Sequence, residues 1–122
     1  MKVTFLGTGT SQGIPVIGCV CEVCKSVDFK NQRTRSAIMF ETLGKTIVID
    51  IGPDFRQQML RERVNKIDAI LITHEHKDHT GGLDDVRPFN FTHEMDMPVF
   101  ARKSVCEQLR IEYDYIFKKN PY

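Results

Sequence analysis

The sequence has 122 residues, of which 27% are charged, and its formal net charge is +1. A chain of this length can bury one hydrophobic core, so a single domain is expected. No basic stripe indicates a nucleic-acid partner, and no run of about 18 apolar residues predicts a membrane span. The N-terminus also lacks a secretory signal pattern, so a cytoplasmic location without nucleic acid or membrane is the default expectation.

The first half of the chain predicts three strands. Alternating apolar residues predict a strand over residues 2–6, followed by a glycine- and proline-rich loop over residues 7–18. Two further strands, residues 36–43 and 46–50, are expected to form a hairpin around Gly44.

A helix is expected next, over residues 54–64, because its apolar residues recur close to the helical period. Asp54 is expected to cap this helix, with Gln57 in the spacing of a capping box. The short, apolar and β-branched segment 67–72 then predicts a buried strand.

The remaining elements are shorter. Residues 80–86 predict a short helix or turn that Pro88 ends, because the residue before proline disfavours helix. Residues 97–101 predict a strand, and residues 104–113 a helix in which Glu107 completes a second capping box. This alternation of strands and helices indicates α/β layers.

Four potential metal ligands follow the strand over residues 67–72: His74, His76, Asp78 and His79. In an extended loop, residues two apart point the same way, so His74 and His76 are expected to hold one ion. Asp78 and His79 are expected to hold a second ion and to be the catalytic residues. Such a pair of divalent ions, Zn²⁺ or Mn²⁺, can polarise water for hydrolysis. The alternative is a solvated polar loop whose histidines have no common role.

Cys19, Cys21 and Cys24 form a second group of potential ligands. Thiolates this close commonly share one structural Zn²⁺, which requires a fourth ligand. Cys106 is remote from them in the sequence, and four cysteines in this arrangement fit metal binding better than two disulfides. The alternative is three reduced surface thiols.

The His-x-His-x-Asp-His motif is similar to the metal signature of the metallo-β-lactamase fold superfamily. The loop Gly7-Thr8-Gly9-Thr10-Ser11-Gln12-Gly13-Ile14-Pro15, the cysteine group, Arg33-Thr34-Arg35-Ser36 and Ile49-Asp50-Ile51-Gly52-Pro53-Asp54-Phe55-Arg56 occur in the same order as in one branch of it. That branch contains the phosphoribosyl cyclic phosphate phosphodiesterases, and the resemblance runs from residue 2 to about residue 98.

The resemblance implies that this chain, residues 1–122, is the N-terminal half of a four-layer αββα sandwich. The superfamily's remaining ligands, two histidines and a bridging aspartate, would lie in a missing C-terminal half, as would a histidine completing the cysteine site. Asp50 matches an aspartate that orients the metal loop, although a helix-capping role is the alternative. A partial domain is expected to need its missing half, or a neighbouring copy, to cover its apolar layers.

The function expected of the full-length protein is a phosphodiesterase acting on a small phosphodiester, with a cyclic phosphodiester as the leading candidate. The alternatives are a thioester or acyl hydrolase of the same fold, processing of tRNA ends, or a non-catalytic metal-binding half-domain. No substrate-binding residue is assigned, because Arg33 and Arg35 fit a phosphate contact no better than a solvated pair. His93, Glu75 and Lys77 are expected at the surface.

Overall fold

A computed structural model describes residues 1–118, in which five strands form one sheet. The elements in chain order are β1 (Lys2–Gly7), the 3-10 helix η1 (Phe29–Asn31), β2 (Ala37–Thr42), β3 (Lys45–Ile49), α1 (Phe55–Arg61), β4 (Ala69–Leu71), α2 (Lys77–Thr80), the 3-10 helix η2 (Leu83–Val86), α3 (Arg87–His93), β5 (Val99–Phe100), α4 (Lys103–Glu112) and α5 (Asp114–Phe117).

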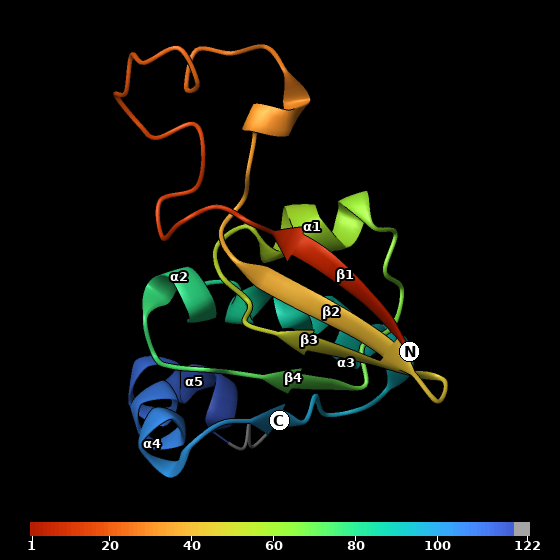
Figure 1. The fold of residues 1–122 in the computed structure, drawn as a ribbon. Helices are drawn as coiled ribbons and strands as arrows, with labels where there is room; N and C mark the ends of the chain where they lie inside the picture. Colours follow the sequence, from red (N-terminus) through yellow and green to blue (C-terminus); the bar gives the residue numbers. More distant parts are fainter. Residues whose placement is uncertain (119–122) are drawn as a thin grey trace.

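The strands follow the chain order across the sheet, β1-β2-β3-β4-β5 (Figure 1). β1, β2 and β3 are antiparallel neighbours, whereas β3, β4 and β5 run parallel. The carboxyl ends of parallel strands meet at one edge, so the segments that follow β3 and β4 lie side by side. The predicted α/β class is confirmed.

One face of the sheet carries the buried core. Met39, Val48 and Ile70 point to this face and are at most 4% exposed. They belong to one cluster with Phe55 of α1 and Leu109 of α4, which ties these helices to the sheet. Burying a side chain of this size contributes about 1.5–3 kcal/mol each.

The opposite face of the sheet is also apolar, but none of its side chains is fully buried. Strand pairing aligns its residues in rows, because paired residues point to the same face. We call this surface the open face; its residues are Val3, Phe5, Ile38, Phe40, Ile47, Ile49, Ala69, Leu71 and Phe100.

The structure confirms the predicted hairpin, in which Leu43 and Gly44 adopt positive φ between β2 and β3. It corrects the helix predicted over residues 54–64. α1 ends at Arg61, where a left-handed Arg63 lets the Val64 N–H donate back to the Met59 carbonyl.

Both predicted capping boxes are wrong. Asp54 makes no side-chain cap; its carboxylate accepts instead from the backbone N–H and guanidinium of Arg35. α4 begins one residue before Ser104, at Lys103, again without a side-chain cap.

The prediction that Pro88 ends a helix is also wrong. Pro88 lies in the first turn of α3, where a missing N–H leaves no hydrogen bond unmade. α3 was not predicted from the sequence.

Candidate metal centre

The predicted metal loop begins where β4 ends, beside the end of β3. The Asp50 N–H donates to the Leu71 carbonyl, so the first residue after β3 is held against β4. Asp50 and Thr73 therefore meet at the same edge of the sheet.

Asp50 organises this edge through three hydrogen bonds. Its carboxylate accepts from the Thr73 N–H at 2.8 Å, from the Thr73 hydroxyl at 2.8 Å, and from His79 Nδ1 at 2.7 Å. Asp50 has a φ of 61° and is only 6% exposed. Aspartate tolerates this left-handed conformation better than most residues, which suits it to a turn that aims a carboxylate back at the loop.

These hydrogen bonds determine which nitrogen of each histidine is free. A carboxylate only accepts, so His79 Nδ1 carries the proton that it donates to Asp50; in the neutral ring the lone pair is then on Nε2, the nitrogen that faces Asp78. The Thr73 hydroxyl gives its hydrogen to Asp50, so its 2.9 Å contact with His74 is donated by His74 Nδ1. In the neutral rings, the Nε2 atoms of His74 and His79 are thus the ones left to bind a metal.

The candidate ligands gather around these two imidazoles. The ring of His74 lies 4.0 Å from that of His79 and 4.7 Å from that of His76, centroid to centroid. His79 Nε2 is 3.1 Å from an Asp78 oxygen. Two ligand atoms each about 2.0–2.1 Å from one Zn²⁺ are about 3–3.5 Å apart, so the pair Asp78 and His79 fits a shared ion.

The chemistry of this donor set fits a divalent ion, although its atoms are spread out. Among residues 1–118, only the cysteines form a group of three or more donors that all lie within 4.8 Å of one another. A wider spread is expected of ligands divided between two ions about 3.5–4 Å apart.

Helix α2 presents Asp78 and His79, and the segment after β3 supports it. The Ile51 N–H donates to the His79 carbonyl at 2.8 Å, and the Gly82 N–H donates back to the Ile51 carbonyl at 2.7 Å. A Cβ atom at Gly52 would overlap the Asp78 carbonyl oxygen. Glycine at position 52 therefore allows the metal loop to approach β3 closely.

The sequence did not reveal the contacts of Lys77. This lysine is exposed, as expected, but its ammonium also donates to Glu112 at 2.6 Å and to the Tyr113 hydroxyl at 3.2 Å. The hydrogen bond with Glu112 raises the pKa of Lys77. These contacts join the metal loop to α4, more than 30 residues later in the chain.

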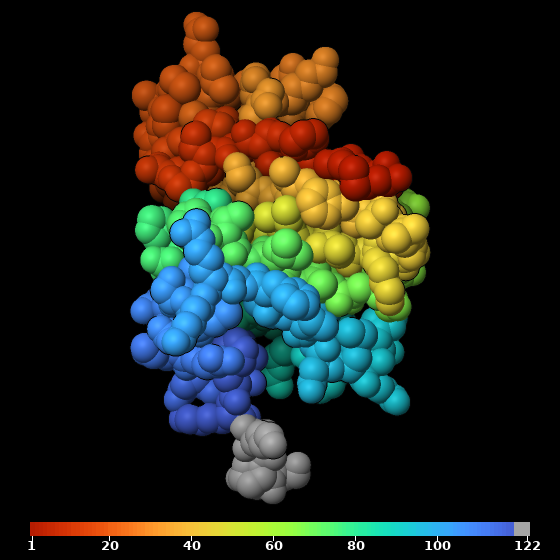
Figure 2. Space-filling model, turned by 60° about the horizontal axis from the view of Figure 1, so that its bottom comes forward, coloured from red at the N-terminus to blue at the C-terminus, as the bar shows by residue number. Residues whose placement is uncertain are grey.

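Cys19, Cys21 and Cys24 come together in the long loop between β1 and β2, which stands out from the sheet edge beside β1 (Figures 1 and 2). The backbone N–H of Cys24, followed by the neighbouring thiols, lowers the pKa of Cys21 to about 7. Among the described residues, no histidine, cysteine or carboxylate supplies a fourth ligand to this group of three thiols. Three thiols at this spacing fit a tetrahedral Zn²⁺ that takes a further ligand.

The other residues considered from the sequence lie apart from the metal loop. Arg33 donates to Thr8, and Arg35 forms an ion pair with Asp54. His93 is half-buried, and its Nε2 lies 2.6 Å from the Asn65 carbonyl oxygen.

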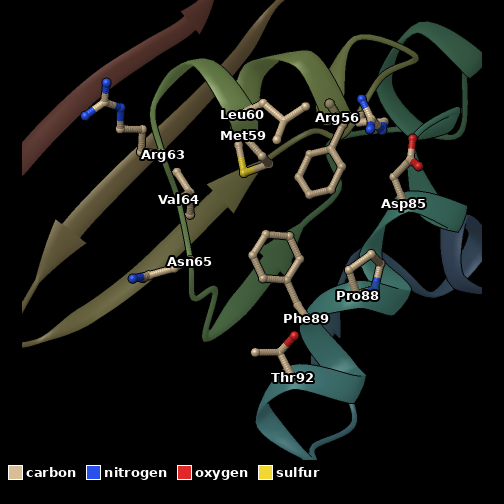
Figure 3. A pocket seen from close by; sticks show the side chains of 11 residues that line it. Arg56, Met59, Leu60, Arg63, Val64, Asn65, Asp85, Pro88, Phe89 and Thr92 are labelled. Atoms are coloured by element: carbon tan, nitrogen blue, oxygen red, sulfur yellow. The ribbon is translucent and has the colours of Figure 1, made fainter.

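A groove of about 560 Å³ lies between α1 and α3. Figure 3 shows Phe89 of α3 facing Met59 of α1 across it, with Arg56 and Arg63 toward the two ends of α1. None of the lining residues is a predicted metal ligand, so the groove is separate from the candidate chemistry.

Comparison with known proteins identifies the family. A model described as the beta-lactamase superfamily domain matches residues 45–121. The chain belongs to the metallo-β-lactamase superfamily. This confirms the superfamily that the His-x-His-x-Asp-His motif predicted, and the structural matches confirm a partial metallo-β-lactamase fold.

Two sequence relatives and one protein of similar fold match this chain. A protein named octanoyltransferase from Porphyromonas gingivalis is 46% identical over 123 residues, a match that covers 100% of this chain and 25% of that protein. A crystal structure described as a new diphosphatase from the PhnP family has a TM-score of 0.90 at 47% identity, covering 94% of this chain and 46% of that one. Zn²⁺-bound PqqB from Methylobacterium extorquens has a TM-score of 0.75 at 23% identity, covering 89% and 40%.

This chain therefore spans between a quarter and just under half of each of these relatives. No helix within residues 1–118 is long and apolar enough to cross a membrane. The cytoplasmic location stays a prediction.

Proposed function

We propose that the complete protein is a metal-dependent phosphodiesterase that cleaves a small cyclic phosphodiester. The observation that carries the proposal is the hydrogen-bond chain from Asp50 through Thr73 to His74, and from Asp50 to His79. It occupies the Nδ1 atoms of two imidazoles and leaves their Nε2 atoms for a metal, beside the Asp78 carboxylate. This arrangement serves a metal site better than a solvated loop, in which each histidine tautomer would be free to exchange.

His74 and His76 are the residues that would hold the first ion, and Asp78 and His79 those that would hold the second. When bound, two divalent ions of the Zn²⁺ or Mn²⁺ kind supply the positive charge that makes water nucleophilic and stabilises charge on the phosphoryl oxygens. Asp78 and His79 are the proposed catalytic residues, because Asp50 fixes the His79 ring and the Asp78 carboxylate lies beside it. Asp50 acts through His79 and Thr73, not on substrate.

Cys19, Cys21 and Cys24 are proposed to hold one structural Zn²⁺. The lowered pKa of Cys21 supports this, because the thiolate is the form of cysteine that binds a metal. A structural ion here would brace a loop of some thirty residues that contains only one short helix.

Residues 1–122 are proposed to be one partial domain that needs a second half. The open face supports this proposal, because a wholly apolar sheet surface normally packs against another layer. The share of each relative that the chain covers agrees with such a missing part. A second copy of the chain is the other partner that could cover this face.

Two other substrate classes have specific support. The diphosphatase of the PhnP family favours a diphosphate linkage, which the same charge arrangement would suit. The name octanoyltransferase favours acyl chemistry, but the match covers a quarter of that protein, so the named activity need not belong to the matched part.

A substrate panel tests the proposal on the complete natural protein loaded with Zn²⁺ or Mn²⁺. The panel holds a cyclic phosphodiester, a linear phosphodiester, a diphosphate and an acyl thioester. We expect the cyclic phosphodiester to be cleaved fastest, and Asp78→Asn to lower that rate by at least about 100-fold. Asp85→Asn is the matched control and should retain the rate. Turnover of the thioester alone, or of none of the four, would contradict the proposal.

A further inference from the structure

We infer that Tyr113, the residue directly after α4, is a positioning residue for the metal loop. Its hydroxyl is hydrogen-bonded to α2, the short helix that carries Asp78 and His79. The inference deepens the proposed function and rests on it only where metal binding is measured.

The Tyr113 hydroxyl makes two contacts, both with α2. It donates to the Thr80 carbonyl at 3.1 Å and accepts from the Lys77 ammonium at 3.2 Å. Lys77 and Thr80 are the first and last residues of α2. One hydroxyl therefore holds both ends of the helix.

The contact with Thr80 satisfies a group that α2 cannot satisfy itself. The last four carbonyls of a helix have no partner within it, and α2 has only four residues. Tyr113 is 6% exposed and Thr80 0% exposed, so water does not replace the bond readily. An unpartnered buried carbonyl carries a substantial penalty, which would favour a shifted α2.

The position of Tyr113 is itself well determined. Val105 and Leu109, on the same side of α4, are buried in the core at 4% and 2% exposure. Glu112 binds Lys77 at 2.6 Å and accepts from Gln108 at 3.0 Å, which holds the end of α4 against the metal loop. A fixed helix can position a short one.

Thr80 connects Tyr113 with the candidate ligands through a second hydrogen bond. Its hydroxyl, buried beneath the loop, donates to the His76 carbonyl at 3.1 Å. A displacement of Thr80 is therefore transmitted to the backbone of His76 and, through α2, to Asp78 and His79. The expected consequence is a looser arrangement of His76, Asp78 and His79.

The substitution Tyr113→Phe removes the hydroxyl and retains the buried ring. Tyr115→Phe is the matched control, because the Tyr115 hydroxyl donates to Asp84 at 2.6 Å and not to α2. Both variants are made in the complete natural protein. Two readouts are used: amide hydrogen exchange of the metal-free protein, and titration with Co²⁺, whose visible absorption reports ligand geometry.

We expect Tyr113→Phe to speed exchange of the amides that close α2, at residues 79–82, and to weaken Co²⁺ binding about threefold to tenfold. That loss is smaller than the 10–100-fold typical of a group bonded directly to a ligand. The Co²⁺ spectrum should also change, because a displaced α2 alters the ligand geometry. A residue that only stabilised the fold would instead lower the melting temperature and leave the spectrum unchanged. Tyr115→Phe should match the wild type in amide exchange, Co²⁺ affinity and Co²⁺ spectrum.

Unchanged exchange at residues 79–82 together with wild-type Co²⁺ affinity would overturn the inference. An unfolding transition that shifts while exchange, affinity and spectrum stay the same would overturn it too. If the wild-type protein binds no Co²⁺, the proposed function fails, and the exchange comparison alone then decides the role of Tyr113.

Discussion

At the residue scale, the molecule uses carboxylates to fix backbone turns at both ends of the sheet. Asp50 does so at the metal edge, where it joins Thr73 and His79. Asp68 does so at the opposite edge, where it accepts from the Thr46 N–H at 2.9 Å and pairs with the Lys45 ammonium. Both residues act on neighbouring strands, so neither role is visible in a local stretch of sequence.

Asp68 predicts a pH dependence of stability. The Thr46 N–H lowers the pKa of this carboxyl from 3.8 to about 2, opposed by burial and helped by Lys45. The folded-state pKa lies below the unfolded one, so this stabilisation is complete above about pH 4 and is lost as the pH falls toward 2. We expect Asp68→Asn to lower the free energy of unfolding at pH 7 by about 1–2 kcal/mol.

Urea unfolding of the complete protein at pH 7, 4 and 2.5 checks this prediction. The difference between Asp68→Asn and the wild type should shrink across the series, and the exposed Asp96→Asn should remain close to the wild type throughout. A difference that stays constant down to pH 2.5 would show that the charge of Asp68 contributes nothing.

At the element scale, the strands and their hairpin could be predicted because apolar alternation and a glycine turn are local signals. The four candidate metal ligands could be proposed for the same reason, since they lie within six residues, and their role as ligands stays a prediction. Helix α3 could not, because its buried contacts come from partners such as Phe55 rather than from its own periodicity. Tyr113 escaped prediction because only the docking of α4 brings it to the loop.

The close approach of α2 to the segment after β3 depends on Gly52. A methyl group there would overlap the Asp78 carbonyl, so Gly52→Ala should displace α2, destabilise the fold by about 1–3 kcal/mol and weaken Zn²⁺ binding. Gly44→Ala is the control: Gly44 has φ +71° but open space around its Cβ position, so only a backbone penalty of about 1 kcal/mol is expected.

Unfolding and zinc titration of both variants distinguish a backbone effect from displacement of α2. Gly44→Ala should lose stability and keep its zinc affinity, whereas Gly52→Ala should lose both. Equal zinc affinities for the two variants would show that the metal loop does not depend on this contact.

At the scale of the whole molecule, both faces of the sheet are apolar. The runs Ile47-Val48-Ile49 and Ala69-Ile70-Leu71 lack the polar alternation of a sheet that faces water. The sequence therefore already indicated a sheet covered on two sides. It could not indicate what covers the open face, because the apolar pattern of the strands does not specify a partner.

We expect the 122-residue chain, expressed alone, to self-associate at micromolar concentration through the open face. Phe5, on this face, is 66% exposed, and Phe5→Lys should raise the monomer fraction by adding a charge that resists burial. Leu60→Lys is the control, because Leu60 is similarly exposed at 61% but lies on α1. Sedimentation velocity over a series of micromolar concentrations measures the monomer fraction of each chain. A wild-type chain that stays monomeric at every concentration would contradict the prediction.

The loop after β4 is proposed to hold metal ions, and every functional proposal for the whole molecule depends on this. The metal content of the complete protein, reconstituted with Zn²⁺ and measured by inductively coupled plasma mass spectrometry, tests it most directly. The double variant His74→Ala and His76→Ala should bind about one ion fewer per chain than the wild type, and His93→Ala should bind as many. An unchanged zinc content in the double variant would contradict the account.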